Sequence, residues 1–235
     1  MSILPLALSW DIRRPPTGEA NEPVWLTELA ELRGRVLYAG GRRMRFRQSN
    51  GGCIDRDPFD RHAYHVLLRN SHRLIGCIRL IPLKNVQRCR TEVLLGLPRF
   101  EQLLVELGVT RHRVGEVGRW VITPEFAACR MGMRLVAGVG NLAIWLGLEA
   151  VVAVVGTRDG QARALMRAGG RPVPGIPPIA SEEYDDEVLV LTFDLVHPPS
   201  TIRTMAAVMD TWFSTELGDE VGAFHDEVMC PVYPI

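Results

Sequence analysis

The stretch Val114-Gly-Glu-Val-Gly-Arg-Trp-Val-Ile122 has the composition of a buried β-strand, yet it carries two charged side chains, Glu116 and Arg119. An ionised group in such a strand costs free energy unless it is paired or has a function. Residues three positions apart in a regular strand point to opposite faces, so the two charges share a face only if the strand bulges, and Gly118 between them favours a bulge. The stretch is therefore one wall of a functional site, a plain buried ion pair, or a strand with one charge at an edge facing water.

The elements expected on either side of this strand mix a hairpin with helical crossovers. Such an order predicts an α/β fold, a three-layer α-β-α sandwich around a mixed central sheet. Apolar residues at helical spacing or proline at a first turn predict the helices, which are 23–37, 98–107, 124 to about 146, 158–168 and 201–217. Alternating or β-branched runs predict the strands, which are 63–69, 74–81, 114–122, 151–155 and 188–196.

The two ends of the chain differ in pattern from its middle. Residues 1–21 carry Pro15-Pro16 and Gly18, which predicts an irregular arm. An arginine-rich segment followed by Ser49-Asn50-Gly51-Gly52 predicts a flap over a site. We therefore expect one domain over 1–198, with the arm and flap in about residues 1–60, and a C-terminal helical extension over 199–235.

The composition argues against several classes of function. The chain has 235 residues, is 47% hydrophobic and 23% charged, and has a formal net charge of zero, so no global field favours nucleic acid. No apolar stretch approaches the roughly 18 residues of a membrane span. The five cysteines form no CxxC pair, so neither a disulfide framework nor a metal site is predicted. A cytoplasmic location is the simplest expectation.

The acidic segment Asp57-Pro-Phe-Asp60 has two interpretations. Asp-Pro favours turn initiation, so the segment can be only a turn before a strand. Together with Asp55, its carboxylates can instead hold a cationic substrate. A calcium loop needs further oxygen ligands downstream, which this sequence lacks.

Two groups of arginines are similarly open to two interpretations. Arg130-Met-Gly-Met-Arg134 lies where coenzyme A-dependent acetyltransferases hold a pyrophosphate on backbone N–H groups. Only Gly132 fits that pattern, which favours a solvated helix face. The second group is either a solvated face or a docking patch for an acidic carrier, and it consists of Arg158, Arg163, Arg167 and Arg171.

Taken in order, these motifs resemble those of the acyl-homoserine-lactone synthases, the autoinducer synthases of bacterial quorum sensing. The resemblance covers about residues 26–196 and implies an acetyltransferase-like (GNAT) fold for the domain over 1–198. It is carried by five motifs: Leu32-Arg33-x-x-Val36, Asp57-Pro-Phe-Asp60, Gly76-Cys-Ile-Arg79-Leu80-Ile81-Pro82, Glu116-Val-Gly-Arg119-Trp-Val, and Leu165-Met-Arg-Ala-Gly169.

The resemblance implies an acyl transfer from a thioester on acyl carrier protein or coenzyme A to the amine of S-adenosylmethionine. Lactone closure then releases methylthioadenosine, and S-adenosylmethionine is a substrate rather than a cofactor. Glu116 would be the general base, Arg119 would bind the substrate carboxylate, and Asp57 and Asp60 would hold its cationic end. Arg33 and Arg79 complete the matched charged positions. The acyl tunnel would be lined by Val121, Leu142, Leu146, Val154 and Val155.

The chain departs from this family at three positions. Leu37 and about Arg43 stand where the family usually has aromatic residues, and Gly118 stands where it usually has serine. Two alternatives therefore remain beside the lactone synthase. One is an N-acyltransferase that makes N-acyl amino acids from acyl carrier protein thioesters, and the other is a non-catalytic acyl-binding or ligand-binding module.

Overall fold

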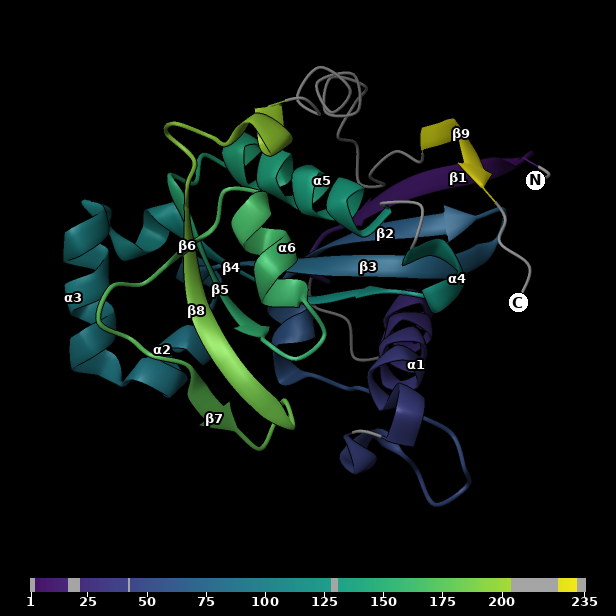
Figure 1. The fold of residues 1–235 in the computed structure, drawn as a ribbon, viewed down its shortest axis with the longest axis horizontal. Coiled ribbons are helices and arrows are strands. Elements are labelled where there is room, and N and C mark those ends of the chain that lie inside the picture. Colours follow the sequence, from purple (N-terminus) through teal and green to yellow (C-terminus); the bar gives the residue numbers. More distant parts are fainter. Residues whose placement is uncertain (1–2, 17–21, 42, 128–130, 204–223, 232–235) are drawn as a thin grey trace.

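The computed structural model describes residues 3–16, 22–41, 43–127, 131–203 and 224–231 of the chain (Figure 1). In this part of the chain a mixed sheet of nine strands has the order β6-β8-β5-β4-β3-β2-β1-β9, with β7 added beside β8. The strands are β1 (Ile3–Arg13), β2 (Tyr64–Asn70), β3 (Arg73–Pro82), β4 (Val114–Ile122), β5 (Ala150–Gly156), β6 (Arg171–Pro172), β7 (Ile179–Ser181), β8 (Asp186–Asp194) and β9 (Phe224–Pro231).

Helices cover both faces of this sheet and make the three layers that the sequence predicts. They are α1 (Val24–Tyr38), α2 (Arg90–Leu95), α3 (Leu97–Leu107), α4 (Pro124–Ala127), α5 (Met131–Trp145) and α6 (Gln161–Arg167). Side chains alternate along β5: Val151 and Ala153 join the core beneath α5 and α6, whereas Ala150 and Val152 join the core beneath α2 and α3. The helix α1 packs on a third core that includes Leu67 of β2.

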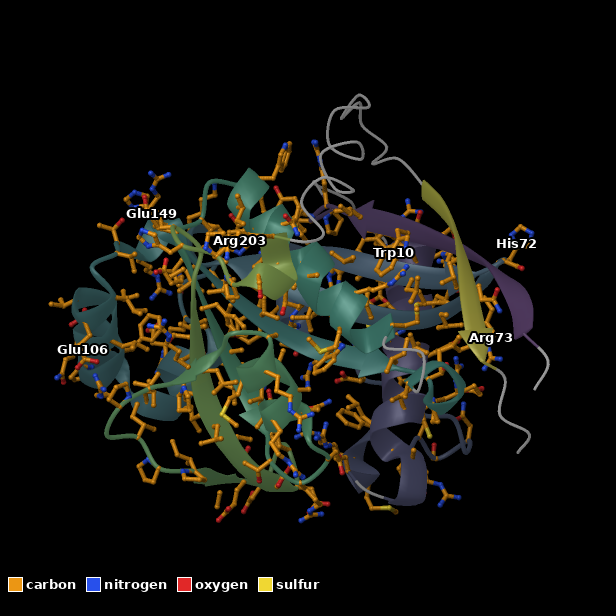
Figure 2. The ribbon with its side chains drawn as sticks, turned by 45° about the horizontal axis from the view of Figure 1, so that its top comes forward. Trp10, His72, Arg73, Glu106, Glu149 and Arg203 are labelled. Atoms are coloured by element: carbon orange, nitrogen blue, oxygen red, sulfur yellow. The ribbon has the colours of Figure 1, made fainter. Side chains whose placement is uncertain are left out.

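The helices and strands of the middle of the chain agree with the sequence prediction. The hairpin of β2 and β3 turns at Ser71 and His72, and Figure 2 shows His72 at the periphery of the molecule. The long helix expected over residues 124–146 is present as α4 and α5, with residues 128–130 outside the described part. The short helix α2 was not predicted from the sequence.

Both ends of the chain differ from the prediction. Residues 3–13, expected to be irregular, form β1, which pairs with β2 from Leu8↔Asn70 to Arg13↔His65. Leu8, Trp10 and Ile12 alternate into the core, and this period of two was obscured by the neighbouring prolines (Figure 2). Residues 224–231, expected to be a polar tail, form β9 on the other side of β1. Most of the helix expected over 201–217 lies outside the described residues.

The parallel strands β4 and β5 are hydrogen-bonded over only the first half of their length. They pair from Val114↔Ala150 to Val117↔Ala153. Beyond that point β4 follows β3 and β5 follows β8. The sheet is therefore split between residues 118–122 and residues 154–156, and this split positions the site.

The predicted bulge in β4 is present, but its residues differ from those expected. Arg79 of β3 pairs with Gly118 and Cys77 pairs with Val121, so two residues, Arg119 and Trp120, lie opposite one. The bulge is thus formed by Arg119 and Trp120 rather than by Gly118. Arg119 has φ of 52°, a left-handed conformation that is costly for a residue with a Cβ. Such strain persists only where the surrounding contacts hold it.

Candidate active site

A close backbone contact brings α1 against the acidic segment. A Cβ atom on Gly34 would lie 2.4 Å from the carbonyl carbon of Cys53, so only glycine permits this approach. The N–H of Asp55 donates to the carbonyl of Ala30 at 2.9 Å. Nη2 of Arg33 then donates to the carbonyl of Asp55 at 2.7 Å. The Arg33 guanidinium thereby reaches the interior beside the carboxylates.

Asp60 joins two buried arginines from different elements. Its carboxylate accepts a bidentate pair of hydrogen bonds from Arg33, with Nη1 at 2.9 Å, and a third from Nη1 of Arg79 at 2.8 Å. Burial acts to raise the pKa of Asp60, but the two guanidinium groups outweigh it and hold that pKa well below its usual range. Asp60 is ionised at neutral pH, and its oxygens are occupied by protein donors.

His65 lies beneath Asp60 with a ring nitrogen 3.0 Å from the Asp60 carbonyl oxygen. Burial lowers the pKa of His65 to about 4, so its ring is neutral at pH 7. Trp25 packs edge-on against this ring. His65 therefore contacts the backbone of Asp60 without adding a charge.

The Asp57 carboxylate contacts three guanidinium groups. Its Oδ2 lies 3.1 Å from Nη1 of Arg79, 2.8 Å from Nη2 of Arg90 and 2.8 Å from Nε of Arg119. Its Oδ1 caps the short helical turn at residues 58–62 by accepting from the N–H of Phe59. Burial acts to raise the pKa of Asp57, but Arg79, Arg119 and Arg90 together hold it well below its usual range.

The last carboxylate comes from the turn between β7 and β8. Glu183 contacts Arg90 and lies 3.2 Å from Nη2 of Arg119 and 3.6 Å from Arg45. Arg33, Arg79, Arg90 and Arg119 face four carboxylates, those of Asp55, Asp57, Asp60 and Glu183. We call these eight residues the ionic cluster, and its formal charges balance.

Glu116 does not pair with Arg119, so a plain ion pair between them is not what the strand carries. The Glu116 carboxylate instead caps α2: Oε2 accepts from the N–H and the hydroxyl of Thr91, each at 2.7 Å, and Oε1 accepts from the N–H of Arg90 at 3.3 Å. Glu116 is 3% exposed. Oε1 receives the longest of these three bonds.

An apolar cleft of about 660 Å³ opens beside the split in the sheet. Its walls come from α1, β4, α5 and α6, and include Leu37, Trp120, Val121 and Gln161. A smaller cavity of about 40 Å³ continues between the separated strands and is lined by Val154 and Val155 among others. Leu37, Arg43, Trp120 and Gln161 line both spaces, so the two are neighbours.

Two residues predicted for the acyl tunnel lie elsewhere. Leu142 is 1% exposed in the core between α5 and the sheet, and Leu146 packs against the same core. The spacing of apolar residues on α5 identifies its buried face but not whether that face meets the sheet or a cleft. Val121, Val154 and Val155 line the two spaces, and their role in an acyl tunnel stays a prediction.

A polar pocket of about 410 Å³ borders the ionic cluster on another side. Asp55, Arg90, Arg119 and Glu183 line it, together with Arg45. Arg119 also lines the apolar cavity between β4 and β5. The bulged residue therefore stands where an apolar space and a polar space meet.

Arg43, from the segment that was predicted to be a flap, reaches the turn between β7 and β8. Nε of Arg43 donates to the carbonyl of Tyr184 at 2.9 Å, and its guanidinium lies 5.3 Å from the centre of the Tyr184 ring. Arg43 and Leu37 thus line the cleft at positions where an aromatic enclosure was expected. Arg90, Glu183 and Tyr184 were not predicted as site residues, because they come from segments without a periodic pattern.

The four arginines proposed for docking are exposed on and around α6. Arg163 and Arg167 lie one helical turn apart, and Arg158 is 3.8 Å from Asp185. Their role in docking stays a prediction. In the described part of the chain no group of three or more His, Cys, Asp or Glu side chains is arranged to hold a metal ion. None of its helices is long and apolar enough to cross a bilayer.

Comparison with known proteins bears on the fold. The family model of the GNAT acetyltransferase domain matches residues 32–137. BjaI, a CoA-dependent acyl-homoserine lactone synthase solved with MTA, superposes with a TM-score of 0.61 at 19% identity, over 86% of this chain and 90% of BjaI. The fold is that of a GNAT acetyltransferase. The resemblance to acyl-homoserine lactone synthases that the motifs indicate is thus confirmed at the level of the fold.

Two further structures of such proteins agree with this assignment. TofI, in a ternary complex with an inhibitor and MTA, has a TM-score of 0.59 at 20% identity, over 85% of this chain and 98% of TofI. BjaI with SAM and isopentyl-CoA gives 0.61 at 18% identity, over 86% of this chain and 90% of BjaI. A search of curated proteins with the sequence gives no match.

Proposed function

We propose that the protein is an acyl-homoserine-lactone synthase, an N-acyltransferase that makes a quorum-sensing signal. It would transfer an acyl group from a thioester to the amine of S-adenosylmethionine and then close the lactone with release of methylthioadenosine. The observation that carries the proposal is the position of Arg119, which lines both the apolar cavity in the split sheet and the polar pocket. A similar fold binds SAM and isopentyl-CoA in BjaI. Both substrates belong to the cytoplasm, where we place the enzyme.

The acyl donor occupies the apolar side in this proposal. Its thioester arm enters through the 660 Å³ cleft, and the acyl chain extends between β4 and β5 toward Val154 and Val155. The bulge leaves Arg119 and Trp120 outside the regular β3–β4 pairing. Their peptide N–H groups are suited to stabilise the oxyanion of the tetrahedral intermediate. The donor is carried by acyl carrier protein or by coenzyme A, and an acidic carrier would dock on the exposed arginines around α6.

S-adenosylmethionine occupies the polar side. The Arg119 guanidinium binds its carboxylate, and the amine faces the thioester carbon across the bulge. Glu116 lines neither of the two spaces that Arg119 lines, so it takes the amine proton through a water as general base. The nitrogen forms the amide while the thiol leaves. A carboxylate oxygen then attacks the γ-carbon, and the C–S bond breaks to give the lactone and methylthioadenosine.

Asp57, Asp60, Arg33 and Arg79 support this site from behind. The oxygens of Asp60 are taken by Arg33 and Arg79, so its part in binding is to orient arginines. Asp57 likewise orients Arg90 and Arg119. Direct contact of either aspartate with the cationic end of the substrate stays a prediction.

Purified protein tests the proposal with S-adenosylmethionine and a series of acyl-coenzyme A and acyl carrier protein thioesters. Mass spectrometry should find an acyl-homoserine lactone and methylthioadenosine in equal amounts. The rival N-acyl amino acid synthase is favoured by Leu37 and Arg43, which line the cleft at positions where aromatic residues to enclose the adenosine group were expected. An acylated amino acid formed without methylthioadenosine would establish that rival instead.

A further inference from the structure

Glu183 holds a position in the ionic cluster unlike that of the other carboxylates. Its side chain is 32% exposed, whereas that of Asp57 is 0% exposed. It comes from a surface turn in which Asp185 adopts φ of 48°, and it lines the 410 Å³ polar pocket. Without it, three aspartates would face four arginines, leaving one positive charge in excess.

Arg90 and Arg119 both contact Glu183 and Asp57. Each uses one edge of its guanidinium to bind Oδ2 of Asp57: Nη2 of Arg90 at 2.8 Å and Nε of Arg119 at 2.8 Å. Arg90 turns its other Nη group, Nη1, to the Glu183 carboxylate. Nη2 of Arg119 lies 2.6 Å from Oδ2 of Asp57 and 3.2 Å from Oε1 of Glu183, so Glu183 bridges the two arginines. Asp57 thus fixes the direction of both arginines, and the outer donors converge on the place of a single carboxylate.

Two like charges this close have an energetic consequence. Burial and the positive charge of Arg119 act to lower the pKa of Arg90, but the charges of Asp57 and Glu183 outweigh them and hold that pKa above its ordinary value. Asp57 and Glu183 thus both stabilise the two neighbouring positive charges. Glu183 can be exchanged for another carboxylate because it is partly hydrated and tethered by a turn, whereas the buried Asp57 is enclosed by three guanidinium groups.

We propose that Arg90 and Arg119 form a subsite for the carboxylate of the amine substrate, and that Glu183 fills this subsite until the substrate displaces it. The inference rests on the proposed function in taking Arg119 as a substrate-binding residue, and it adds Arg90 as a second one and Glu183 as an internal competitor. The subsite selects amines that carry a carboxylate. Amines that lack one leave Glu183 in place and bind without gaining the arginine contacts.

Binding measurements test the subsite independently of turnover. Calorimetry at low ionic strength would compare L-methionine, S-adenosylmethionine and decarboxylated S-adenosylmethionine on wild type, Glu183→Gln and Glu182→Gln. Glu182 is the matched control, because it is exposed in the same turn and its loss changes the net charge equally. Glu183→Gln should bind both carboxylate ligands at least about tenfold more tightly than wild type. Glu182→Gln should match wild type, and the decarboxylated ligand should gain nothing.

A second variant tests whether the tighter binding of carboxylate ligands depends on Arg90. Arg90→Gln combined with Glu183→Gln should lose the tenfold gain, because one of the two convergent donors is missing. Thermal melting would check that each variant is folded, and Glu183→Asp provides a charge-preserving variant with binding close to wild type. Equal binding of L-methionine by wild type and Glu183→Gln, or equal gains with and without the carboxylate, overturns the subsite. Tighter carboxylate binding without any release of methylthioadenosine in the turnover assay would retain the subsite and reject the lactone synthase.

Discussion

Arg119 and Asp57 are separated by 62 positions in the chain, yet Nε of Arg119 lies 2.8 Å from Oδ2 of Asp57. This contact explains why Arg119 tolerates a left-handed φ of 52° in the middle of a strand. The bulge turns its guanidinium toward the ionic cluster, and Asp57 holds it there. Several consequences of this arrangement can be measured.

Replacing Asp57 by Asn should destabilise the protein and abolish activity. Three guanidinium groups contact the Asp57 carboxylate, so the variant leaves buried positive charge uncompensated, at a cost of about 3–5 kcal/mol. Urea unfolding at pH 7 gives the free energy of unfolding. The exposed Glu101 provides the control, because Glu101→Gln should change it by less than about 0.5 kcal/mol. A similar small change for Asp57→Asn would show that the cluster does not depend on this carboxylate.

His65 should make stability sensitive to mildly acidic pH. Its folded pKa is about 4 against 6.5 as the ordinary value, so between these pH values the unfolded chain binds more protons. Stability therefore falls as pH drops from about 6.5 and this contribution levels off below about 4, for a loss of at most about 3 kcal/mol. The depressed pKa values of Asp57 and Asp60 act only at lower pH.

Unfolding of wild type and His65→Gln at pH 7.5, 5.5 and 4.5 separates these effects. The glutamine amide can still donate to the Asp60 carbonyl but does not titrate. The free energy of unfolding of the variant should therefore change less with pH over this range. Parallel curves for the two proteins would mean that His65 is not the titrating group.

Gly34→Ala should disrupt the docking of the acidic segment on α1. The added methyl group would lie 2.4 Å from backbone atoms of Cys53 and Ile54, and such overpacking costs about 1–3 kcal/mol or more. Gly138→Ala on α5 is the matched control, since its Cβ would meet only Val66 at 3.7 Å. That variant should be neutral or more stable by up to about 1 kcal/mol. Thermal melting and activity assays of both variants check this difference in stability.

Glu116→Gln should lower kcat by at least about 100-fold if Glu116 is the general base. KM for S-adenosylmethionine should change little, because Glu116 lines neither space that Arg119 lines. Thr91→Val is the control: it removes one hydrogen bond to Oε2 and keeps the carboxylate, so its kcat should stay nearer to wild type. Full activity in Glu116→Gln would exclude the general-base role.

Val155→Phe should shorten the acyl chains that the enzyme accepts. The larger side chain fills the cavity between β4 and β5, so kcat/KM for long donors should fall at least about tenfold relative to short donors. Leu142→Ala is the contrasting variant. Leu142 lies in the core, so its truncation should cost about 2–5 kcal/mol of stability without changing the chain-length preference. The opposite pattern would restore Leu142 to the acyl tunnel.

Local patterns in the sequence determined much of the fold. The apolar stretch of β4, the hairpin of β2 and β3 and the periodic helices were predictable because burial imposes a period of about two or 3.6 on neighbouring residues. The charged residues of β4 and the acidic segment were identifiable as candidates for the same reason: charge in a buried pattern requires an explanation. The strand β1 was not predicted, because prolines on both sides of its alternating apolar residues favoured an irregular arm.

The tertiary structure alone decided which of these groups meet. Nothing near Glu116 in the sequence indicates that it caps α2, and nothing near Glu183 indicates that it bridges Arg90 and Arg119. Periodicity shows that a face is apolar, but not whether it packs on a sheet, as Leu142 does, or lines a cleft, as Val121 does. The physical reason is that the split between β4 and β5 and the close approach at Gly34 arise from packing between segments far apart in the chain. The charged strand was determined by the sequence, whereas its partners were determined by long-range packing.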